Sequence, residues 1–172
     1  MSRTVLQINP DHLQTIFAHA ERTYPEECCG LLLGQVEPQA SASQTETHRL
    51  VEVWATENTW NAEAEAEMRA IASETATHPL TKDRRYWIDP KEMLEAQRYA
   101  RSKNLDIVGI YHSHTDHAAV PSECDRLCAW PHYSYLIVSV QQGNAQDVLS
   151  WRLDEKRQFQ SEEILTVAPA SP

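Results

Sequence analysis

The sequence has few basic residues for its length. Among 172 residues, 15 are Lys or Arg and 25 are Asp or Glu, which gives a formal net charge of -10 at pH 7. Binding to nucleic acid needs clustered basic side chains that neutralise phosphates, and the sequence has no such cluster. We therefore expect no nucleic-acid partner, and acidic partners are disfavoured as well.

Long apolar runs are also missing. No stretch approaches the roughly 18 or more consecutive apolar residues of a membrane-spanning helix. Residues 1–4 lead into a short predicted strand and a charged helix, which differs from a secretory signal peptide. We expect a cytoplasmic protein without a membrane partner, and the length favours one domain with a substantial core.

The four cysteines lack the spacing of a structural zinc site. Cys28 and Cys29 are adjacent, while Cys124 and Cys128 are four residues apart, so neither pair forms a Cys-x2-Cys knuckle. In a reducing compartment we expect small buried thiols. Two alternatives make Cys124 a zinc ligand in place of the neighbouring Asp125, or a thiol nucleophile.

The most informative segment contains two histidines, His112 and His114, separated by Ser113. The preceding residues 105–110 are apolar and β-branched, which predicts a strand that continues into the histidines. Residues two apart in a strand share a face, so both imidazoles can bind one metal ion. Asp125 could supply a third ligand and leave one tetrahedral position open, as in catalytic zinc sites.

The same region has an ordinary structural interpretation. Two histidines on a strand are often incidental, and Ser122 could be a helix N-cap with Asp125 as its partner in a capping box. Pro121, just outside the helix, fits such a start. In this interpretation, an Asp125 that turns back to the N-cap amide could not also bind zinc. The combined spacing favours the metal site.

The spacing His-x-His, seven residues, Ser, two residues, Asp resembles that of the JAMM (MPN-plus) zinc metalloproteases. A second segment, residues 25–34, resembles the early motif of this family, in which a glutamate stands shortly before a Cys-Gly pair. That glutamate corresponds to Glu27. Further resemblance involves Asn58 and residues 86–90 and 133–140, and it extends from about Val5 to about Trp151. The chain looks like a compact bacterial member, similar to those that process sulfur carriers.

The resemblance implies one Zn2+ per chain, bound by the two motif histidines and Asp125, and hydrolysis of an amide. Zinc lowers the pKa of a bound water toward about 7 and polarises the scissile carbonyl. Glu27 would accept a proton from that water and pass it to the leaving amine, and Ser122 would donate to the developing oxyanion. Glu26 is the alternative proton acceptor, on the opposite side of a strand.

Members of this family cleave after the C-terminal Gly-Gly of ubiquitin or ubiquitin-like proteins, which implies such a partner here. Only seven residues separate Asp125 from Tyr133, so the second insertion with which other members grip ubiquitin chains is lacking. This favours a small sulfur carrier. Alternatives are a catalytically silent MPN scaffold and a zinc hydrolase of a small molecule. Self-association into a homo-oligomer is compatible with all three.

The expected architecture is the single-domain α/β fold of JAMM proteins, which is cytidine-deaminase-like, with a central mixed sheet flanked by helices. The domain would cover residues 1–166, with an acidic insertion at about 57–85 that contains a partial helix and could act as a lid, and a disordered tail at 167–172. The expected helices are 10–24, 90–103 and 122–130; the expected strands are 5–8, 28–36, about 50–54, 105–114, 133–140 and 147–153.

Overall fold

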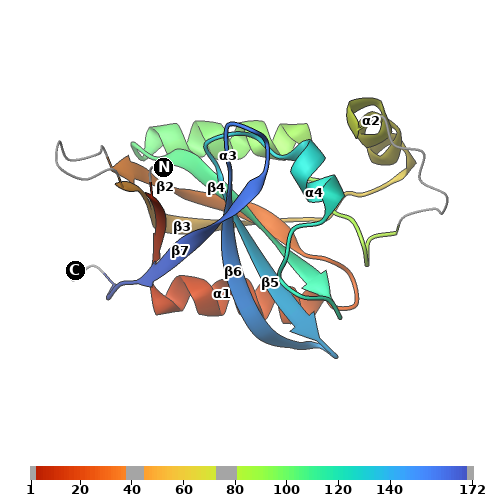
Figure 1. Cartoon of the computed structure of the whole chain (residues 1–172), viewed down its shortest axis with the longest axis horizontal. Helices are drawn as coiled ribbons and strands as arrows, with labels where there is room; N and C mark the ends of the chain where they lie inside the picture. The colour runs from red at the N-terminus through yellow and green to blue at the C-terminus, as the bar shows by residue number, and fades with distance from the viewer. Residues whose placement is uncertain (1–2, 38–44, 73–80, 170–172) are drawn as a thin grey trace.

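The computed structural model describes residues 3–37, 45–72 and 81–169, which form one mixed α/β domain (Figure 1). Its elements in chain order are β1 (Arg3–Ile8), α1 (Pro10–Thr23), β2 (Cys29–Glu37), β3 (Thr45–Thr56), α2 (Ala62–Ala72), α3 (Pro90–Ser102), β4 (Asp106–Thr115), α4 (Glu123–Cys128), β5 (Ser134–Gln141), β6 (Asn144–Leu153) and β7 (Phe159–Thr166). Within these residues, no helix has the length and apolar content needed to span a membrane.

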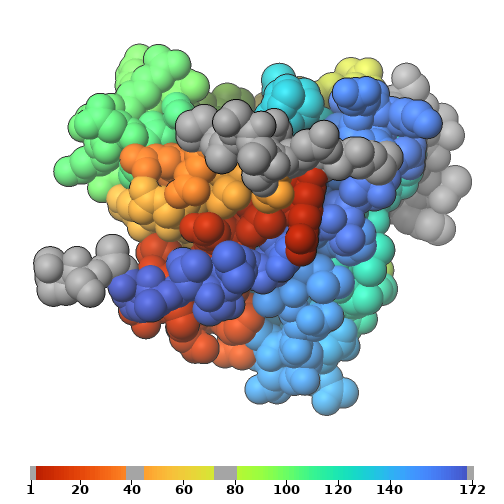
Figure 2. Space-filling view, turned by 60° about the vertical axis from the view of Figure 1, so that its left-hand side comes forward, coloured from red at the N-terminus to blue at the C-terminus, as the bar shows by residue number. Residues whose placement is uncertain are grey.

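The strands form a closed barrel in the order β1-β3-β2-β4-β5-β6-β7. β1 pairs in parallel with both β3 and β7, and β4 pairs in parallel with β5, whereas the other pairs are antiparallel. Figure 2 shows the last strand beside the first at the surface. The predicted mixed α/β class is confirmed. The prediction of a central sheet did not include its closure, and the cytidine-deaminase-like fold stays a prediction.

The barrel closes through a strand that the sequence analysis missed. Two closing strands were expected, but β7 follows them and pairs with both β6 and β1. The pairing continues beyond the strand, because the backbone N of Val167 donates to the carbonyl of Ile8 at 3.0 Å. The remaining predicted tail is described only to residue 169, and residues 170–172 lie outside the described part.

Helices α1 and α3 cover different faces of the strands (Figure 1). Each begins with a side-chain cap: Asn9 accepts from the His12 backbone, and Asp89 accepts from the Lys91 backbone, both at 2.8 Å. Side chains in β2 alternate between these helices, since Leu32 packs in the α1 core and its two neighbours pack in the α3 core. The result is two apolar cores on either side of one layer of strands.

The acidic insertion contains the partial helix that the sequence predicts, α2, although residues 73–80 lie outside the described residues. α2 packs against α4 through a small apolar cluster that includes Trp60, Met68 and Cys124. α4 is shorter than predicted, because Ala129 has extended backbone angles (ψ 141°) that end the helix at Cys128. The insertion therefore lies beside the helix that carries Asp125.

Candidate active site

Strand β4 places both motif histidines on the face away from α1. Ser113, which lies between the two histidines, accepts a hydrogen bond from the Cys28 backbone N at 2.8 Å. Tyr111, which precedes them, forms a hydrogen bond with His19 of α1 at 2.7 Å. Because side chains alternate in a strand, His112 and His114 share the opposite face, as predicted. β4 pairs on both sides, with β2 and β5, so the backbone that carries the imidazoles is fixed.

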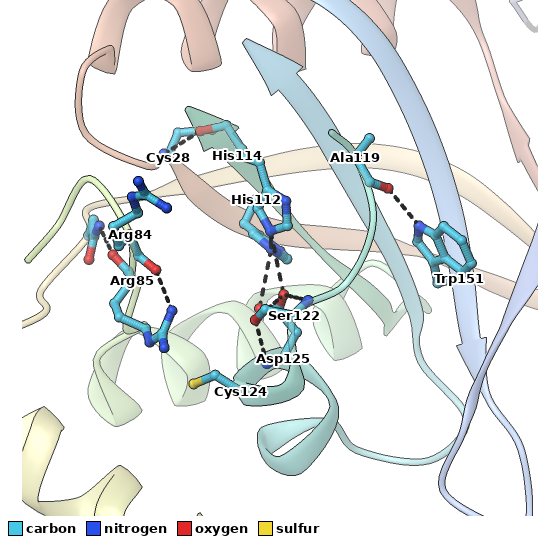
Figure 3. A network of polar contacts seen from close by, with 12 residues as sticks. Cys28, Arg84, Arg85, His112, His114, Ala119, Ser122, Cys124, Asp125 and Trp151 are labelled. Carbon is cyan, nitrogen blue, oxygen red and sulfur yellow. Dashed lines mark hydrogen bonds and ion pairs between the residues drawn. The ribbon is translucent and has the colours of Figure 1, made fainter. Parts of the chain in front are cut away.

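The two histidines and Asp125 have the spacing of a zinc site (Figure 3). The two Nε2 atoms are 3.1 Å apart, and each lies 3.4 Å from an oxygen of Asp125. Ligand atoms about 2.0 to 2.1 Å from a tetrahedral zinc are separated by about 3.3 to 3.4 Å. The group is largely buried and could hold a metal ion.

The orientation of His114 is set by its second ring nitrogen. Nδ1 donates to the carbonyl of Ala118 at 2.8 Å, which leaves the Nε2 lone pair available to a metal. The loop that carries this carbonyl is itself anchored, because Trp151 Nε1 donates to the carbonyl of Ala119 at 3.0 Å (Figure 3). The loop between β4 and α4 thus fixes the orientation of the His114 ring.

Asp125 combines two roles that the sequence analysis treated as exclusive. Its Oδ2 accepts from the backbone N and the hydroxyl of Ser122 at 2.6 and 2.8 Å, and Ser122 Oγ accepts from the Asp125 backbone, which completes a capping box. The same carboxylate still faces both histidines. Burial alone would raise the pKa of Asp125, but the two imidazoles keep it well below its usual value. The capping box thus positions the carboxylate.

Glu27 precedes β2 and lines the same cavity as His114, Ser122 and Asp125. Its exposed fraction is 6%, whereas Glu26 is exposed to solvent. Burial raises the pKa of Glu27 from 4.5 to about 8; the charge of His114 opposes this increase. A buried carboxyl with a pKa near neutrality can both accept and release a proton.

The backbone around Glu27 is attached to the segment that precedes α3. Glu27 N donates to the carbonyl of Lys82 at 2.8 Å. The amide of Asn58 donates to the carbonyls of Glu27 and Arg85 at 3.0 and 2.9 Å, and its oxygen accepts from Trp87 N at 3.2 Å. These bonds fix the position of Glu27 relative to one wall of the cavity.

The cavity has a volume of about 610 Å3 and is bordered mostly by apolar side chains. Its apolar wall is formed by Trp60, Met68, Ile71, Trp87, Ile88, Pro90, Met93, Val120 and Trp130. α2 contributes part of this wall, so the acidic insertion borders the candidate site. His114 and Asp125 of the candidate metal group, Glu27 and a large apolar surface therefore line one cavity.

Cys124 does not join the ligand group. Its Sγ contacts Met68 Sδ at 2.9 Å, whereas the metal group consists of His112, His114 and Asp125. Hydrogen bonding to Cys128 and burial both raise the pKa of the Cys124 thiol, which disfavours a thiolate nucleophile. All four cysteines are free, and three are buried, in agreement with the expectation of small buried residues.

Sequence reasoning assigned no role to three residues of this site. Tyr86 stacks on His112, Asn58 bonds to the backbone of Glu27, and Arg85 lines the cavity. Asn58 and Tyr86 were noticed only as points of resemblance. Their roles depend on contacts between distant segments, and local spacing carries no signal for such contacts.

Two proteins of known name are similar to this chain. The CysO-cysteine peptidase of Mycobacterium tuberculosis (strain ATCC 25618 / H37Rv) is 29% identical over 154 residues, covering 87% of this chain and 83% of that protein. The desampylase of Haloferax volcanii is 35% identical over 91 residues, covering 49% of this chain and 64% of that protein.

Two solved structures are similar over nearly the whole chain. A Salinibacter ruber protein has 31% identity and a TM-score of 0.61, covering 99% of this chain and 94% of that one. A Desulfitobacterium hafniense protein, with 23% identity and a TM-score of 0.69, covers 96% and 94% respectively and shares the fold. Residues 9–154 match the family described as prokaryotic homologs of the JAB domain, and the chain belongs to this JAB/MPN family, as its motifs indicated.

Proposed function

We propose that this protein is a zinc-dependent peptidase or isopeptidase that hydrolyses the amide bond after the C-terminal Gly-Gly of a small ubiquitin-like or sulfur-carrier protein. The observation that carries the proposal is that His114 and Asp125, two of the three candidate ligands, line the same cavity as Glu27. The substrate class is supported by relatives named CysO-cysteine peptidase and desampylase.

A zinc ion held by His112, His114 and Asp125 would supply a nucleophile at neutral pH and polarise the scissile carbonyl. Glu27 accepts a proton from the attacking water as the new C–O bond forms and the carbonyl oxygen gains negative charge. It then delivers this proton to the leaving amine as the carbonyl re-forms and the C–N bond breaks. Burial prepares Glu27 for this exchange, since it raises the pKa of the carboxyl to about 8.

Ser122 is the proposed donor to the developing oxyanion. Its hydroxyl points to Asp125 Oδ2 at 2.8 Å before substrate binds, so it must rotate toward the new negative charge during the reaction. Removing one such donor typically costs about 2.7 to 4 kcal/mol in the transition state. Ser122 thus has a positioning role toward Asp125 and a proposed catalytic role.

The test combines metal analysis with cleavage of a diglycine-ended carrier extended by one or two residues. We expect about one zinc per chain and release of the extension by the wild type, whereas Glu27→Gln should retain zinc and lose cleavage by about 10²-fold or more. Full activity of Glu27→Gln, or a purified protein without stoichiometric zinc, would refute the mechanism. Binding of the carrier without cleavage would favour a silent scaffold.

A further inference from the structure

Arg85 lines the cavity, and the hydrogen-bonding capacity of its guanidinium is only partly used within the described part of the chain. Its Nη1 donates to the carbonyl of Arg84 at 2.8 Å, while its Nε is buried and has no hydrogen-bond partner in the described part of the chain. Within the described residues, Arg85 also forms no ion pair with an acidic side chain. A buried guanidinium donor without a partner costs free energy, unless a ligand supplies the acceptor.

The position of Arg85 relative to Glu27 is fixed by the Asn58 amide, which donates to the backbone carbonyls of both residues. Arg85 and Glu27 both line the cavity. The positive charge of Arg85 acts to lower the pKa values of Glu27 and Cys124, against the larger effect of burial. Figure 3 shows the Arg85 guanidinium turned toward Cys124 and α4, whereas the Arg84 guanidinium turns the other way. Arg84 also lines the cavity, but of these two guanidinium groups it is that of Arg85 that points toward Cys124.

The leaving group must lie beside Glu27, because Glu27 gives its proton to the leaving amine. In a single amino acid, the α-amine and the α-carboxylate are attached to the same carbon atom. A one-residue leaving group therefore brings a carboxylate close to the side of the cavity where Arg85 lies. The guanidinium fork matches a carboxylate with two parallel hydrogen bonds.

We infer that Arg85 binds the free α-carboxylate of a one-residue leaving group, so that the enzyme releases a single C-terminal amino acid from its carrier. The inference rests on the proposed function and makes it more specific. A lysine joined through its side chain has its carboxylate far from the reacting amine, so this contact selects against isopeptide substrates. The apolar wall near Cys124 and Met68 would face the side chain of the departing residue.

The test uses a diglycine-ended carrier extended by one alanine, prepared with a free carboxylate and as the C-terminal amide. We expect the wild type to cleave the acid on the order of 10- to 100-fold faster than the amide in kcat/KM, the range of a charge-assisted hydrogen bond. Arg85→Gln should bring the ratio of kcat/KM for the acid to kcat/KM for the amide close to one, and an effect of the lost charge on Glu27 changes both rates alike and cancels in this ratio. Arg85→Lys, which keeps the charge without the fork, should be intermediate.

Arg98→Gln is the matched control, since Arg98 is exposed on α3 and does not line the cavity. It should retain the preference for the acid, and thermal melting should show that each variant is folded. If the wild type cleaves acid and amide equally, or Arg85→Gln slows both equally, the inference is wrong while the proposed function stands. If the wild type cleaves neither substrate, the proposed function and the inference fail together.

Discussion

The ring of Tyr86 lies almost parallel to the imidazole of His112, with 4.5 Å between the ring centroids and 25° between the planes. His112 Nδ1 is buried and has no hydrogen-bond partner within the described ranges, whereas Nδ1 of His114 donates to a carbonyl. Metal-binding histidines are usually oriented by such a bond. We therefore expect that packing against Tyr86, in place of such a hydrogen bond, orients the imidazole of His112.

We predict that Tyr86→Ala weakens zinc binding by about 10-fold or more, the range seen when the support of a ligand is lost. Tyr86→Phe keeps the ring and should retain the affinity of the wild type. Competition with a chromophoric chelator measures both dissociation constants. Equal affinities for the Ala and Phe variants would show that another contact orients His112.

The two roles of Ser122 can be separated by comparing stability with turnover. Ser122→Ala removes the N-cap side chain of α4 and should lower the free energy of unfolding by about 1 kcal/mol. If the hydroxyl also stabilises the oxyanion, kcat should fall by about 10²-fold or more. Ser122→Thr, which keeps a hydroxyl and a cap, is the control. A lower melting temperature with unchanged turnover would leave only the capping role.

In the metal-free protein, the titration of Glu27 should contribute a loss of stability as the pH rises from 4.5 to about 8. In this window the folded protein keeps a proton on Glu27, because burial raises its pKa to about 8, whereas the unfolded chain has released it. The folded state binds more protons, so the free energy of unfolding decreases with rising pH, by at most about 1.4 kcal/mol per pH unit.

Glu27→Gln removes this titration. Urea unfolding in the presence of a chelator, at both ends of the window, should therefore show a stability gain for the variant that grows with pH. If the free energies of unfolding of the variant and the wild type differ by the same amount at both pH values, Glu27 ionises at its ordinary pKa in the folded state.

A second pH dependence, of opposite sign, should come from His48. Its Nε2 lies 2.9 Å from Arg152 Nη1, and its Nδ1 lies 2.9 Å from Ser134 Oγ. Burial, followed by the charge of Arg152, lowers the pKa of His48 from 6.5 to about 4, although Glu46 opposes the change. Between these pH values His48 is protonated in the unfolded chain and neutral in the folded chain. The contribution of His48 to stability should therefore fall as the pH drops from 6.5 to 4.

The measurement is chemical unfolding across this range, with His48→Gln compared with His132→Gln. His132 is exposed, and its variant is the control for replacing a histidine elsewhere in the chain, whereas His48→Gln should flatten the slope of the wild type. Parallel slopes for the two variants would contradict the prediction.

Local patterns in the sequence were sufficient for much of the fold. Helix α1 was predicted from its apolar stripe and from Pro10, and β4 from the β-branched run before His112. Strand β7 was missed for a physical reason. Its one buried residue is Glu162, whose carboxylate accepts from Ser150 at 2.6 Å, so an inward position carries a charged side chain and the apolar alternation of a strand is absent.

The site was predictable only where its chemistry is concentrated in short motifs. The histidines and Asp125 stand fourteen or fewer residues apart, and their spacing anticipated the cluster that the fold assembles. Tyr86 and Arg85 belong to a polar segment whose contacts with β4 and Glu27 arise only after folding. Nor could the spacing reveal that one carboxylate would serve both the capping box and the ligand group, because this depends on which oxygen faces which neighbour.

The side-chain amide of Asn58 couples two parts of the candidate site through hydrogen bonds. It joins the backbone before β2 to the Arg85–Trp87 segment, so an outward displacement of that wall pulls directly on Glu27. Under the proposed mechanism, a substrate that fits the cavity poorly would displace Glu27, the proposed proton carrier, as well as the wall that binds the substrate. Discrimination between tails can therefore be expressed in the rate of proton transfer, even when their affinities are alike.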